Sequence, residues 1–247
     1  MKKKIWILLL LLSILILCMI FIFKSQLRTL ARMTWIDIKS IHQDVKIIDG
    51  IPYLNQFTLG YPTGCEAVSA TMLLQFKGYD IKVEDIIENT PTQERGKYIY
   101  ENQVYAGNPF KVFVGHPSKG KSEGSYGCFA EPIVVAMQKF AGDKVKNISG
   151  CEEETLFSYI DEGEPVVVWG IKNAGDIEEG VIWKYPDGSG SFKELIGEHC
   201  FVLIGYDDQL VYLDDPSAGR HVEQPKEKFI KNWKALYSQA IIVEGQI

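Results

Sequence analysis

The sequence predicts an α+β domain, in which a helical half packs on an antiparallel sheet and one N-terminal transmembrane helix precedes both. Helical patterns dominate the first half of residues 47–247, and apolar strand patterns dominate the second half. Two of the strand patterns form a hairpin, which makes them antiparallel. Helices that come first and antiparallel strands that come later are typical of α+β folds rather than of alternating α/β folds.

The helices are indicated by capping patterns and by the spacing of apolar residues. "TGCEAVSATMLLQFKG" places Thr63 and Glu66 in the T-x-x-E spacing of a capping box. "SGCEEETLFSYIDEG" repeats that spacing with Ser149 and Glu152. "VEDIIEN" and "FAEPIVVAMQKFAG" predict two further helices between them. Residues 91–128 are rich in Gly, Pro and Lys, so we expect a long irregular excursion there.

The strands come next along the chain. "PVVVWGI" is a continuous apolar run, which predicts a central strand with both faces buried. "HCFVLIGYDDQLVYLDDP" predicts a hairpin that turns near "DDQ". "EKFIKNWKAL" predicts a helix, and "QAIIVE" predicts a closing strand.

The N-terminus predicts a membrane span. Residues Ile5–Phe23 form an uncharged apolar run of 19 residues. As a helix this run is roughly 28 Å long, about the thickness of a hydrocarbon core. No small-x-small cleavage site follows it, and Leu17 rather than a small residue precedes Cys18. We therefore expect an uncleaved signal anchor.

The expected organisation has three parts: a cytoplasmic tip with the anchor (1–23), a stalk (24–46) and a folded domain (47–247). Basic residues flank the span on both sides, so the positive-inside rule is nearly balanced. The tail of only four residues before the span favours a cytoplasmic N-terminus. The expected localisation is thus the cell membrane, with a single pass and an extracytoplasmic domain.

The distribution of charge argues against nucleic acid as a partner. Residues 1–32 hold six basic and no acidic residues, which leaves 20 basic and 32 acidic residues for the rest of the chain. That remainder has a formal charge of −12. An acidic surface repels phosphate backbones.

The cysteines after the span, Cys65, Cys128, Cys151 and Cys200, include no C-x-x-C pair. This argues against a zinc ribbon or a thioredoxin-type motif. Cys65, Cys200 and His199 have no fourth ligand at a helpful spacing, so we expect no metal and no cofactor. In an extracytoplasmic domain, Cys128 and Cys151 are the pair open to a disulfide.

Cys65 is the candidate nucleophile. With Thr63 as the N-cap, Cys65 lies in the first helical turn, where backbone N–H groups are unpaired and the helix dipole is positive. Both effects favour a thiolate and lower the pKa of a cysteine. The glycine-rich approach "LGYPTG" leaves the start of the helix open. The alternative interpretation is a buried structural cysteine.

His199 is the candidate proton carrier, although a hydrogen-bonded histidine at a strand end is the alternative. The second arm of the hairpin ends in "LDDP", which returns a carboxylate to its side. If residue i pairs with residue 416 − i, Asp215 shares the face of His199; if the sum is 415, Asp214 does. Spacing leaves both registers open. Glu198 and Cys200 are expected to point to the opposite face of this strand.

Gln56, in "IPYLNQF", lies nine residues before Cys65. Its side-chain amide and the Cys65 N–H would together provide two donors for a developing oxyanion. A glutamine on a surface loop is the alternative.

Together these segments resemble a known family. "PYLNQ", "GCEAVSATMLLQFKGY", "LFSYIDEGEPVVVWG", "GEHCFVLIGYDDQLVYLDDP" and "FIKNW" are similar to papain-like cysteine peptidases related to the bacteriocin-leader (double-glycine) peptidases, cysteine peptidase family thirty-nine. The resemblance is strongest to the stand-alone, membrane-anchored branch of Gram-positive bacteria, and it covers about residues 47–245. It implies a papain-like peptidase domain, with a helical half that carries the cysteine and a sheet that carries the histidine.

The resemblance also implies roles for individual residues. Cys65 would be the nucleophile, and His199 would be the general base and then the acid that protonates the leaving amine. Asp215 would orient His199, which selects the 416 register, and Gln56 would line the oxyanion hole.

The resemblance has limits. The leader peptidases proper precede a transporter, and this chain has no transporter or ATPase motif, so a double-glycine leader is not the expected substrate. The expected function is a membrane-anchored cysteine peptidase that acts on a peptide or protein outside the cell through a thioester. A cell-wall peptide amidase or transpeptidase on the same fold and a non-catalytic surface-binding module are the alternatives.

Overall fold

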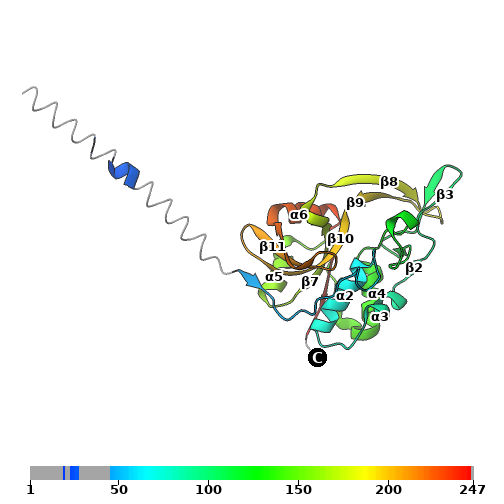
Figure 1. Ribbon diagram of the computed structural model, residues 1–247, viewed down its shortest axis with the longest axis horizontal. Coiled ribbons are helices and arrows are strands. Elements are labelled where there is room, and N and C mark those ends of the chain that lie inside the picture. Colours follow the sequence, from blue (N-terminus) through cyan, green and yellow to red (C-terminus); the bar gives the residue numbers. More distant parts are fainter. Residues whose placement is uncertain (1–18, 20–22, 28–44, 246–247) are drawn as a thin grey trace, which may run out of the picture. The chain divides into compact units, whose positions relative to one another are not determined.

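A seven-stranded antiparallel sheet is the centre of the described part of the computed structural model (Figure 1). Six strands follow the order β12-β11-β10-β7-β13-β6, and β1 pairs with the end of β10. The bounds are β1 (Lys46–Ile47), β6 (Val145–Asn147), β7 (Val166–Ile171), β10 (Glu198–Tyr206), β11 (Leu210–Asp215), β12 (Gly219–Pro225) and β13 (Ala240–Val243). The predicted central strand is β7, which lies between β10 and β13, and the predicted hairpin is β10–β11.

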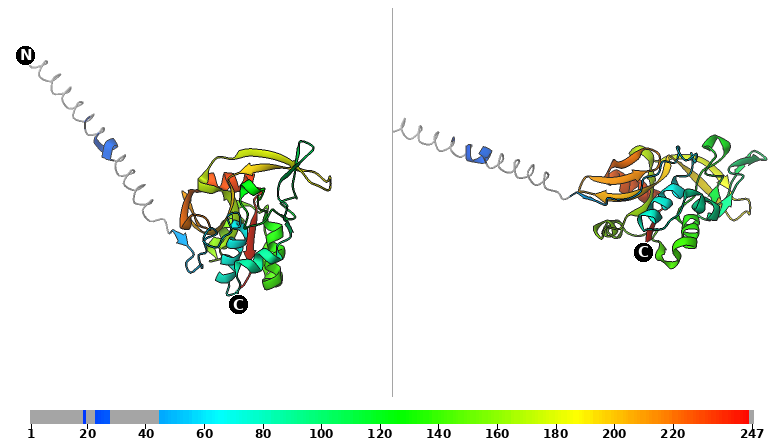
Figure 2. Two further views of the ribbon diagram at one scale, coloured as in Figure 1. Left: turned by 45° about the vertical axis from the view of Figure 1, so that its right-hand side comes forward. Right: turned by 60° about the horizontal axis from the view of Figure 1, so that its bottom comes forward.

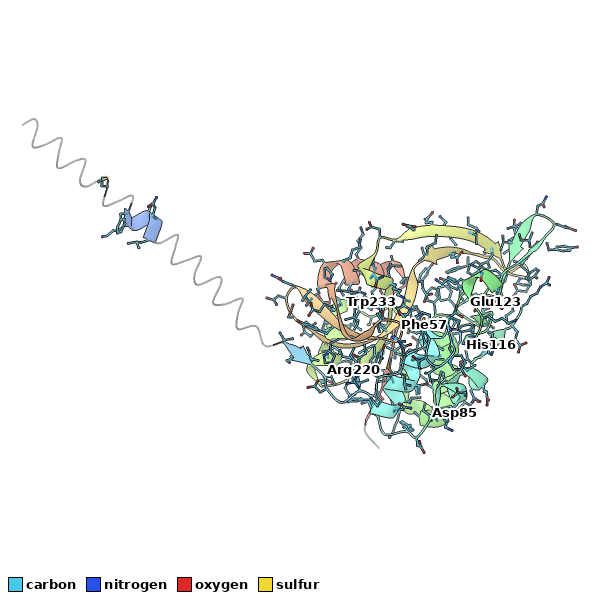
Figure 3. The ribbon with its side chains drawn as sticks, in the orientation of Figure 1. Phe57, Asp85, His116, Glu123, Arg220 and Trp233 are labelled. Atoms are coloured by element: carbon cyan, nitrogen blue, oxygen red, sulfur yellow. The ribbon has the colours of Figure 1, made fainter. Side chains whose placement is uncertain are left out.

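Helices cover both faces of this sheet, as Figures 1 and 2 show. Helices α2 (Cys65–Phe76), α3 (Val83–Asn89) and α4 (Ala130–Ala141) form one layer, while α5 (Glu153–Asp161) and α6 (Lys226–Ala235) form the other. Side chains of β10 alternate between the layers: Val202 packs with α2, and Phe201 packs with α6. Each layer closes over a hydrophobic core, and Trp233 of α6, labelled in Figure 3, is fully buried. The predicted α+β class with an antiparallel sheet is therefore confirmed.

A second, smaller sheet was not expected from the sequence. Its strand order is β3-β4-β8-β9, with β3 (Tyr98–Tyr100), β4 (Gln103–Tyr105), β8 (Glu178–Lys184) and β9 (Ser191–Ile196). Two short strands, β2 (Thr92–Gln93) and β5 (Phe113–Val114), pair elsewhere in the same region. The expectation of an irregular excursion at 91–128 is right for most of its residues, but it missed these short strands, and Tyr105 of β4 pairs with Lys184 of β8, far along the chain. Strands this short carry almost no periodic pattern of their own.

The predicted capping box at the start of α2 is wrong. The helix begins at Cys65, Gly64 is its N-cap, and no side chain caps it. Thr63 Oγ1 donates instead to the carbonyl of Lys119 at 2.8 Å and lies 2.9 Å from the hydroxyl of Ser125. The loop at 116–125 therefore competes successfully for the hydroxyl that the sequence assigned to the helix.

The second predicted capping box is wrong for the same physical reason. Helix α5 begins at Glu153, with Glu152 as its N-cap and no side-chain cap. The hydroxyl of Ser149 accepts a hydrogen bond from the N–H of Ala240 at 3.1 Å. A partner that is distant in the sequence again takes the capping group.

The structure describes residues 19, 23–27 and 45–245. Within the described residues, 45–245 form one compact unit, separate from the N-terminal part of the chain. The predicted membrane span at Ile5–Phe23 lies outside the described residues except for two positions, and most of the predicted stalk lies outside them as well. Within the described residues, no helix combines the length and the apolar character needed to cross a bilayer.

Gly205 allows β1 to join the sheet. A Cβ at this position would lie 2.2 Å from the carbonyl oxygen of Lys46 and 3.0 Å from the Cα of Ile47. Both are backbone atoms, so no side-chain rotation relieves the clash. The next residue along, Ile48, donates its N–H to the carbonyl of Ile204 at 2.7 Å.

We predict that Gly205→Ala displaces β1 and lowers the free energy of unfolding by about 1–3 kcal/mol. Hydrogen exchange at the Ile48 N–H should become faster, and urea unfolding should give the loss of stability. Gly190→Ala is the control, because the nearest atom to its added Cβ lies at 3.4 Å. Unchanged protection of Ile48 would show that the pairing of β1 tolerates the methyl group.

Candidate active site

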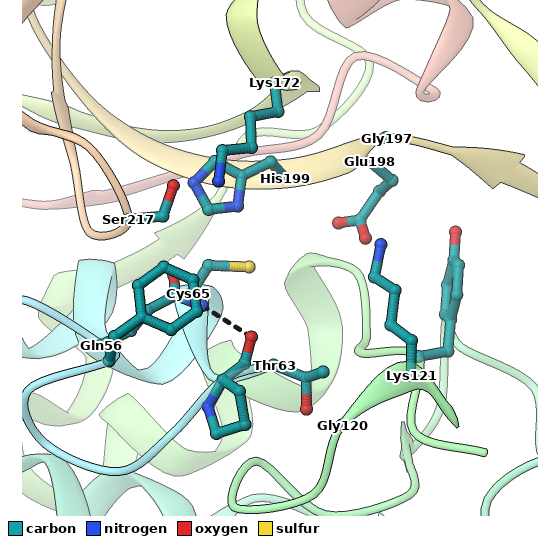
Figure 4. A pocket seen from close by; sticks show the side chains of 13 residues that line it. Gln56, Thr63, Cys65, Gly120, Lys121, Lys172, Gly197, Glu198, His199 and Ser217 are labelled. Atoms are coloured by element: carbon teal, nitrogen blue, oxygen red, sulfur yellow. Dashed lines mark hydrogen bonds between the residues drawn. The ribbon is translucent and has the colours of Figure 1, made fainter. Parts of the chain in front are cut away.

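A cavity of about 230 Å³ opens where the N-terminus of α2 meets the start of β10 (Figure 4). Three of the predicted site residues line it: Gln56, Cys65 and His199. The fourth, Asp215, is bonded to His199. The structure therefore brings together four residues that span 160 positions of the sequence.

Cys65 is the first residue of α2 rather than the third residue of a capping box. Its side chain is 6% exposed, and its Sγ donates to Oε2 of Glu66 at 3.3 Å. In Figure 4 the sulfur is drawn below the ring of His199 and extends toward the side of the cavity that holds Glu198 and Lys121.

The expected lowering of the Cys65 pKa is wrong for this arrangement. Burial raises the pKa of the thiol well above its ordinary value, and the carboxyl groups of Glu66 and Glu198 raise it further. The backbone N–H of Cys200 lowers it only in part. Desolvation and two acidic neighbours thus outweigh the helix N-terminus, and the resting group is a thiol.

His199 and Asp215 form a buried pair. Nε2 of His199 lies 2.7 Å from Oδ1 of Asp215, and the side chains are 6% and 2% exposed. Because a carboxylate only accepts, Nε2 carries the hydrogen of this bond, and Nδ1 is the ring nitrogen left to exchange a proton. The edge of Phe201 packs against the ring at a centroid distance of 4.7 Å and an angle of 89°. This contact helps to hold the plane of the imidazole.

The strand register decides between the two aspartates. Val202 pairs with Asp214 and Leu203 with Leu213, so the sum is 416 beside His199. A bulge farther along shifts the pairing, and Tyr206 lies opposite Val211. Asp215 therefore shares the face of His199, as the family resemblance implied.

Asp215 is ionised. Burial raises its pKa, but the hydrogen bond and the charge of His199, together with the N–H of Ser217, bring it below the ordinary value. That N–H donates to Oδ1 at 2.7 Å. The hydroxyl of Tyr53 donates to the backbone carbonyl of Asp215 at 3.0 Å. The carboxylate is thus fixed by its own turn and by the segment before α2.

Asp214 has a different role. It is 2% exposed, and its Oδ1 accepts the backbone N–H of His221, a residue of β12, at 3.0 Å. Burial raises its pKa, and the N–H of His221 and the nearby Arg220 oppose that rise. Asp214 therefore bonds β11 to β12 at the point where the register of the two strands shifts.

Gln56 lines the cavity and is 3% exposed. Its Nε2 donates one hydrogen to the carbonyl of Pro62 at 2.9 Å, a bond drawn as a dashed line in Figure 4. Its backbone N–H donates to the carbonyl of Pro216, next to Asp215, at 2.9 Å. The amide has a second N–H, so one donor remains for the cavity.

Two acidic residues of the site were missed by the sequence analysis. Glu66 is fully buried, and its Oε1 accepts the N–H of Cys128 at 2.8 Å. Glu198 does lie on the opposite face of β10 from His199, as expected, yet α2 covers that face and Glu198 lines the same cavity. The strand alternation was right, but the position of the cavity relative to the sheet could not be read from it.

Lys121 is the third residue that the sequence analysis missed. It comes from the loop at 116–125 and reaches toward Glu198 in Figure 4. No local pattern connects this loop to α2. The hydrogen bonds of Thr63 to the loop are what hold it at the start of the helix.

The disulfide left open by the sequence is not formed. Cys128 is buried, Cys151 is half-buried, and both are free thiols. Cys128 lies near Glu66 rather than near Cys151, because its N–H bonds to that carboxylate. Within the described residues, no group of three or more His, Cys, Asp or Glu side chains is arranged to hold a metal ion.

The comparisons with known proteins give one consistent result. A family model described as Peptidase_C39 like matches residues 48–241. The uncharacterized protein YvpB of Bacillus subtilis (strain 168) is 28% identical over 206 residues, which cover 83% of this chain and 79% of YvpB. The crystal structure of a candidate C39-like peptidase from Bacillus anthracis matches with a TM-score of 0.71 and 28% identity, over 82% of this chain and 98% of that one. The predicted resemblance is confirmed.

The buried Glu66 makes stability depend on pH. Burial raises its pKa from 4.5 to about 7, although its hydrogen bonds oppose the rise. The protonated form is therefore favoured in the folded state. The associated stability is fully present below about pH 4.5 and is lost as the pH rises through about 7.

We predict that the wild-type chain loses about 2–3 kcal/mol of unfolding free energy relative to Glu66→Gln between pH 5 and pH 8. Glutamine keeps an acceptor for Cys128 but does not titrate. Urea unfolding at the two pH values measures the difference, with Glu178→Gln, which removes an exposed carboxyl group, as the control. Parallel pH profiles for wild type and Glu66→Gln would contradict the raised pKa.

Proposed function

Because this chain belongs to the C39-like family of papain-like cysteine peptidases, we propose that it hydrolyses a peptide or amide bond by a Cys-His-Asp mechanism. The observation that carries the proposal is the hydrogen bond between His199 and Asp215 at the edge of the cavity that holds Cys65. A carboxylate behind an imidazole, with a nucleophile on its other side, is the arrangement of a general-base triad.

The chemistry begins with the thiol turned toward His199. Nδ1 takes the proton of Cys65 as the sulfur attacks the carbonyl carbon of the substrate, and Asp215 stabilises the imidazolium. The oxyanion accepts hydrogen bonds from the Cys65 N–H and from Gln56. The imidazolium then protonates the leaving amine, and a thioester remains on the sulfur. Water, deprotonated by His199, attacks the thioester and releases the acid and the thiol.

This order of events suits a thiol with a raised pKa. Since Cys65 is protonated at rest, the proton has to leave during the attack, and the imidazole is the group that receives it. The scheme involves no metal or cofactor. Water and a second amine compete for the same thioester, so a cell-wall amidase or transpeptidase would use the same residues.

We also infer a position at the membrane. The 19-residue apolar run Ile5–Phe23 supports a single-pass anchor, and the proposal places the folded domain on the extracytoplasmic side. The substrate would then be a peptide or protein outside the cell.

A non-catalytic binding module is the second candidate. The observation that favours it is the protonated Cys65, which donates to Glu66 rather than to His199. The two candidates differ in whether His199 controls the reactivity of the thiol. A membrane-impermeant thiol probe on intact cells tests this point and the side of the membrane together.

We predict that Cys65 of the full-length chain reacts with this probe near neutral pH and that His199→Ala slows labelling at least about a hundredfold. Cys65→Ser should abolish hydrolysis and leave the thermal midpoint nearly unchanged, since serine has a similar size. Cys151→Ser, which removes a half-buried thiol, is the control and should keep the labelling. Labelling of Cys65 only after denaturation would favour the binding module.

We predict that Asp215→Asn lowers the turnover number at least about a hundredfold and that Asp214→Asn lowers it much less. The first change replaces the carboxylate that holds the His199 tautomer by an amide, whereas the second changes a carboxylate bonded to the backbone of β12. Peptide hydrolysis by the two variants, with thermal midpoints measured alongside, gives the ranking. A larger loss in Asp214→Asn would mean that Asp214 is the orienting carboxylate.

A further inference from the structure

The cavity contains polar atoms that the protein itself leaves unsatisfied. Among the described residues, the buried side-chain oxygens Gln56 Oε1 and Glu198 Oε1 have no hydrogen-bond partner, and both line the cavity. Buried polar atoms are costly unless they are paired. Their concentration in one cavity indicates that a bound ligand pairs with them.

The wall beside the sulfur of Cys65 is acidic. Glu66 and Glu198 both approach Gly127: a Cβ there would lie 2.2 Å from Oε1 of Glu66 and 3.8 Å from Oε2 of Glu198. Only glycine leaves room for this arrangement, in which the two carboxyl groups face the same stretch of backbone. Glu198 is 6% exposed, and its Oε1 has no hydrogen-bond partner.

The protein opposes this acidity only weakly. Burial raises the pKa of Glu198 well above its ordinary value, and repulsion from Glu66 and Glu194 adds to it, while Lys121 lowers it. Lys121 is exposed. Among the described residues, no cationic nitrogen, that of Lys121 included, forms an ion pair with the carboxylate of Glu198 at 4 Å or less. Its ammonium group only reaches toward the carboxylate (Figure 4). The acidic wall therefore lacks a close positive partner.

An anionic ligand fits the cavity less well. Lys121 and Lys172 are the two cationic side chains that line it, and Figure 4 shows them on different sides. Lys172 lies over the ring of Phe57 at 5.7 Å, near His199 rather than near Glu198. Neither lysine is buried, whereas both carboxyl groups are.

We propose that Glu198, supported by Glu66 and Tyr126, is the subsite for a positively charged side chain of the substrate, a lysine or an arginine next to the scissile bond. The inference rests on the proposed function and names the substrate class of the same site. An ammonium or guanidinium group would donate to Glu198 Oε1 and to the hydroxyl of Tyr126, and Lys121 would move aside.

The subsite has a consequence for the nucleophile. Burial is the main reason that Cys65 stays protonated, and the charged forms of Glu66 and Glu198 would disfavour its thiolate further; a cation placed beside these carboxyl groups opposes that effect. The basic side chain would thus lower the free energy of the attacking sulfur as well as bind. Substrates that lack it would lose turnover and not only affinity.

Paired peptides test the subsite through hydrolysis. The full-length chain should cleave peptides with arginine at one position near the scissile bond about tenfold faster, in kcat/KM, than the same peptides with citrulline. Glu198→Gln should bring the ratio close to one, and Lys121→Met should raise it. Glu178→Gln, an exposed carboxyl group removed elsewhere on the domain, should keep the wild-type ratio. Cleavage without preference in the wild type would overturn the subsite and leave the proposed function standing.

Thiol reagents test the subsite without hydrolysis. Cys65 is modified with a cationic reagent, 2-aminoethyl methanethiosulfonate, and with a neutral one, methyl methanethiosulfonate. The two modification rates are compared by mass spectrometry of the peptide that contains Cys65. The cationic-to-neutral ratio in the wild type should fall about tenfold in Glu198→Gln and to a smaller extent in Tyr126→Phe. A cationic preference without any peptide cleavage would support the subsite and contradict the peptidase. Equal rates for the two reagents in the wild type, or a faster reaction of the anionic 2-sulfonatoethyl reagent, would overturn the subsite. This comparison uses the wild type alone, so it stands even if a variant fails to fold.

Discussion

The contact between helix α2 and strand β10 is the constraint on which the site depends. The first ten residues of α2 are buried, so the helix has no solvent face along most of its length and can only lie inside the core. The hydroxyl of Ser69 donates to the carbonyl of Cys200 at 3.3 Å, which fixes the helix along the strand. This contact places the N-terminus of α2, and with it Cys65, next to the end of β10 that carries His199. The segment before α2 secures the other side, since Tyr53 and Gln56 bond to the turn that follows β11.

The electrostatics of the site combine two opposing effects. A helix N-terminus favours a thiolate, but burial and two carboxyl groups favour the thiol, and the second effect is larger here. A peptidase with this arrangement depends on its imidazole to remove the proton during the attack. It also gains from a substrate that brings a positive charge of its own. The acidic wall then selects among substrates. It lowers the reactivity of the Cys65 sulfur toward neutral substrates, whereas a cationic substrate offsets the acidic charge and restores that reactivity.

The loop at 116–125 and the small sheet show why part of the site could not be predicted. Lys121 reaches the cavity because the hydroxyl of Thr63 bonds to the loop, a contact between residues more than 50 positions apart. The same hydroxyl was expected to cap α2, since a capping box is judged from four residues alone. Strands of two or three residues, such as β3 and β4, are defined by their partners and not by a periodic pattern. In each case a distant partner outcompetes the local one.

The sequence by itself determined the class of the fold, the central strand β7, the β10–β11 hairpin and the residues Gln56, Cys65 and His199 as the candidates for one site. These follow from patterns within short segments, and such patterns reflect burial and backbone preference. Only the tertiary structure decided between Asp214 and Asp215, because the register depends on how two strands pair. It alone placed Glu66 and Glu198 beside the thiol and reversed the expected direction of the Cys65 pKa. A pKa depends on every charge and every desolvated surface within a few ångströms, and that neighbourhood is assembled from parts of the chain that no local pattern connects.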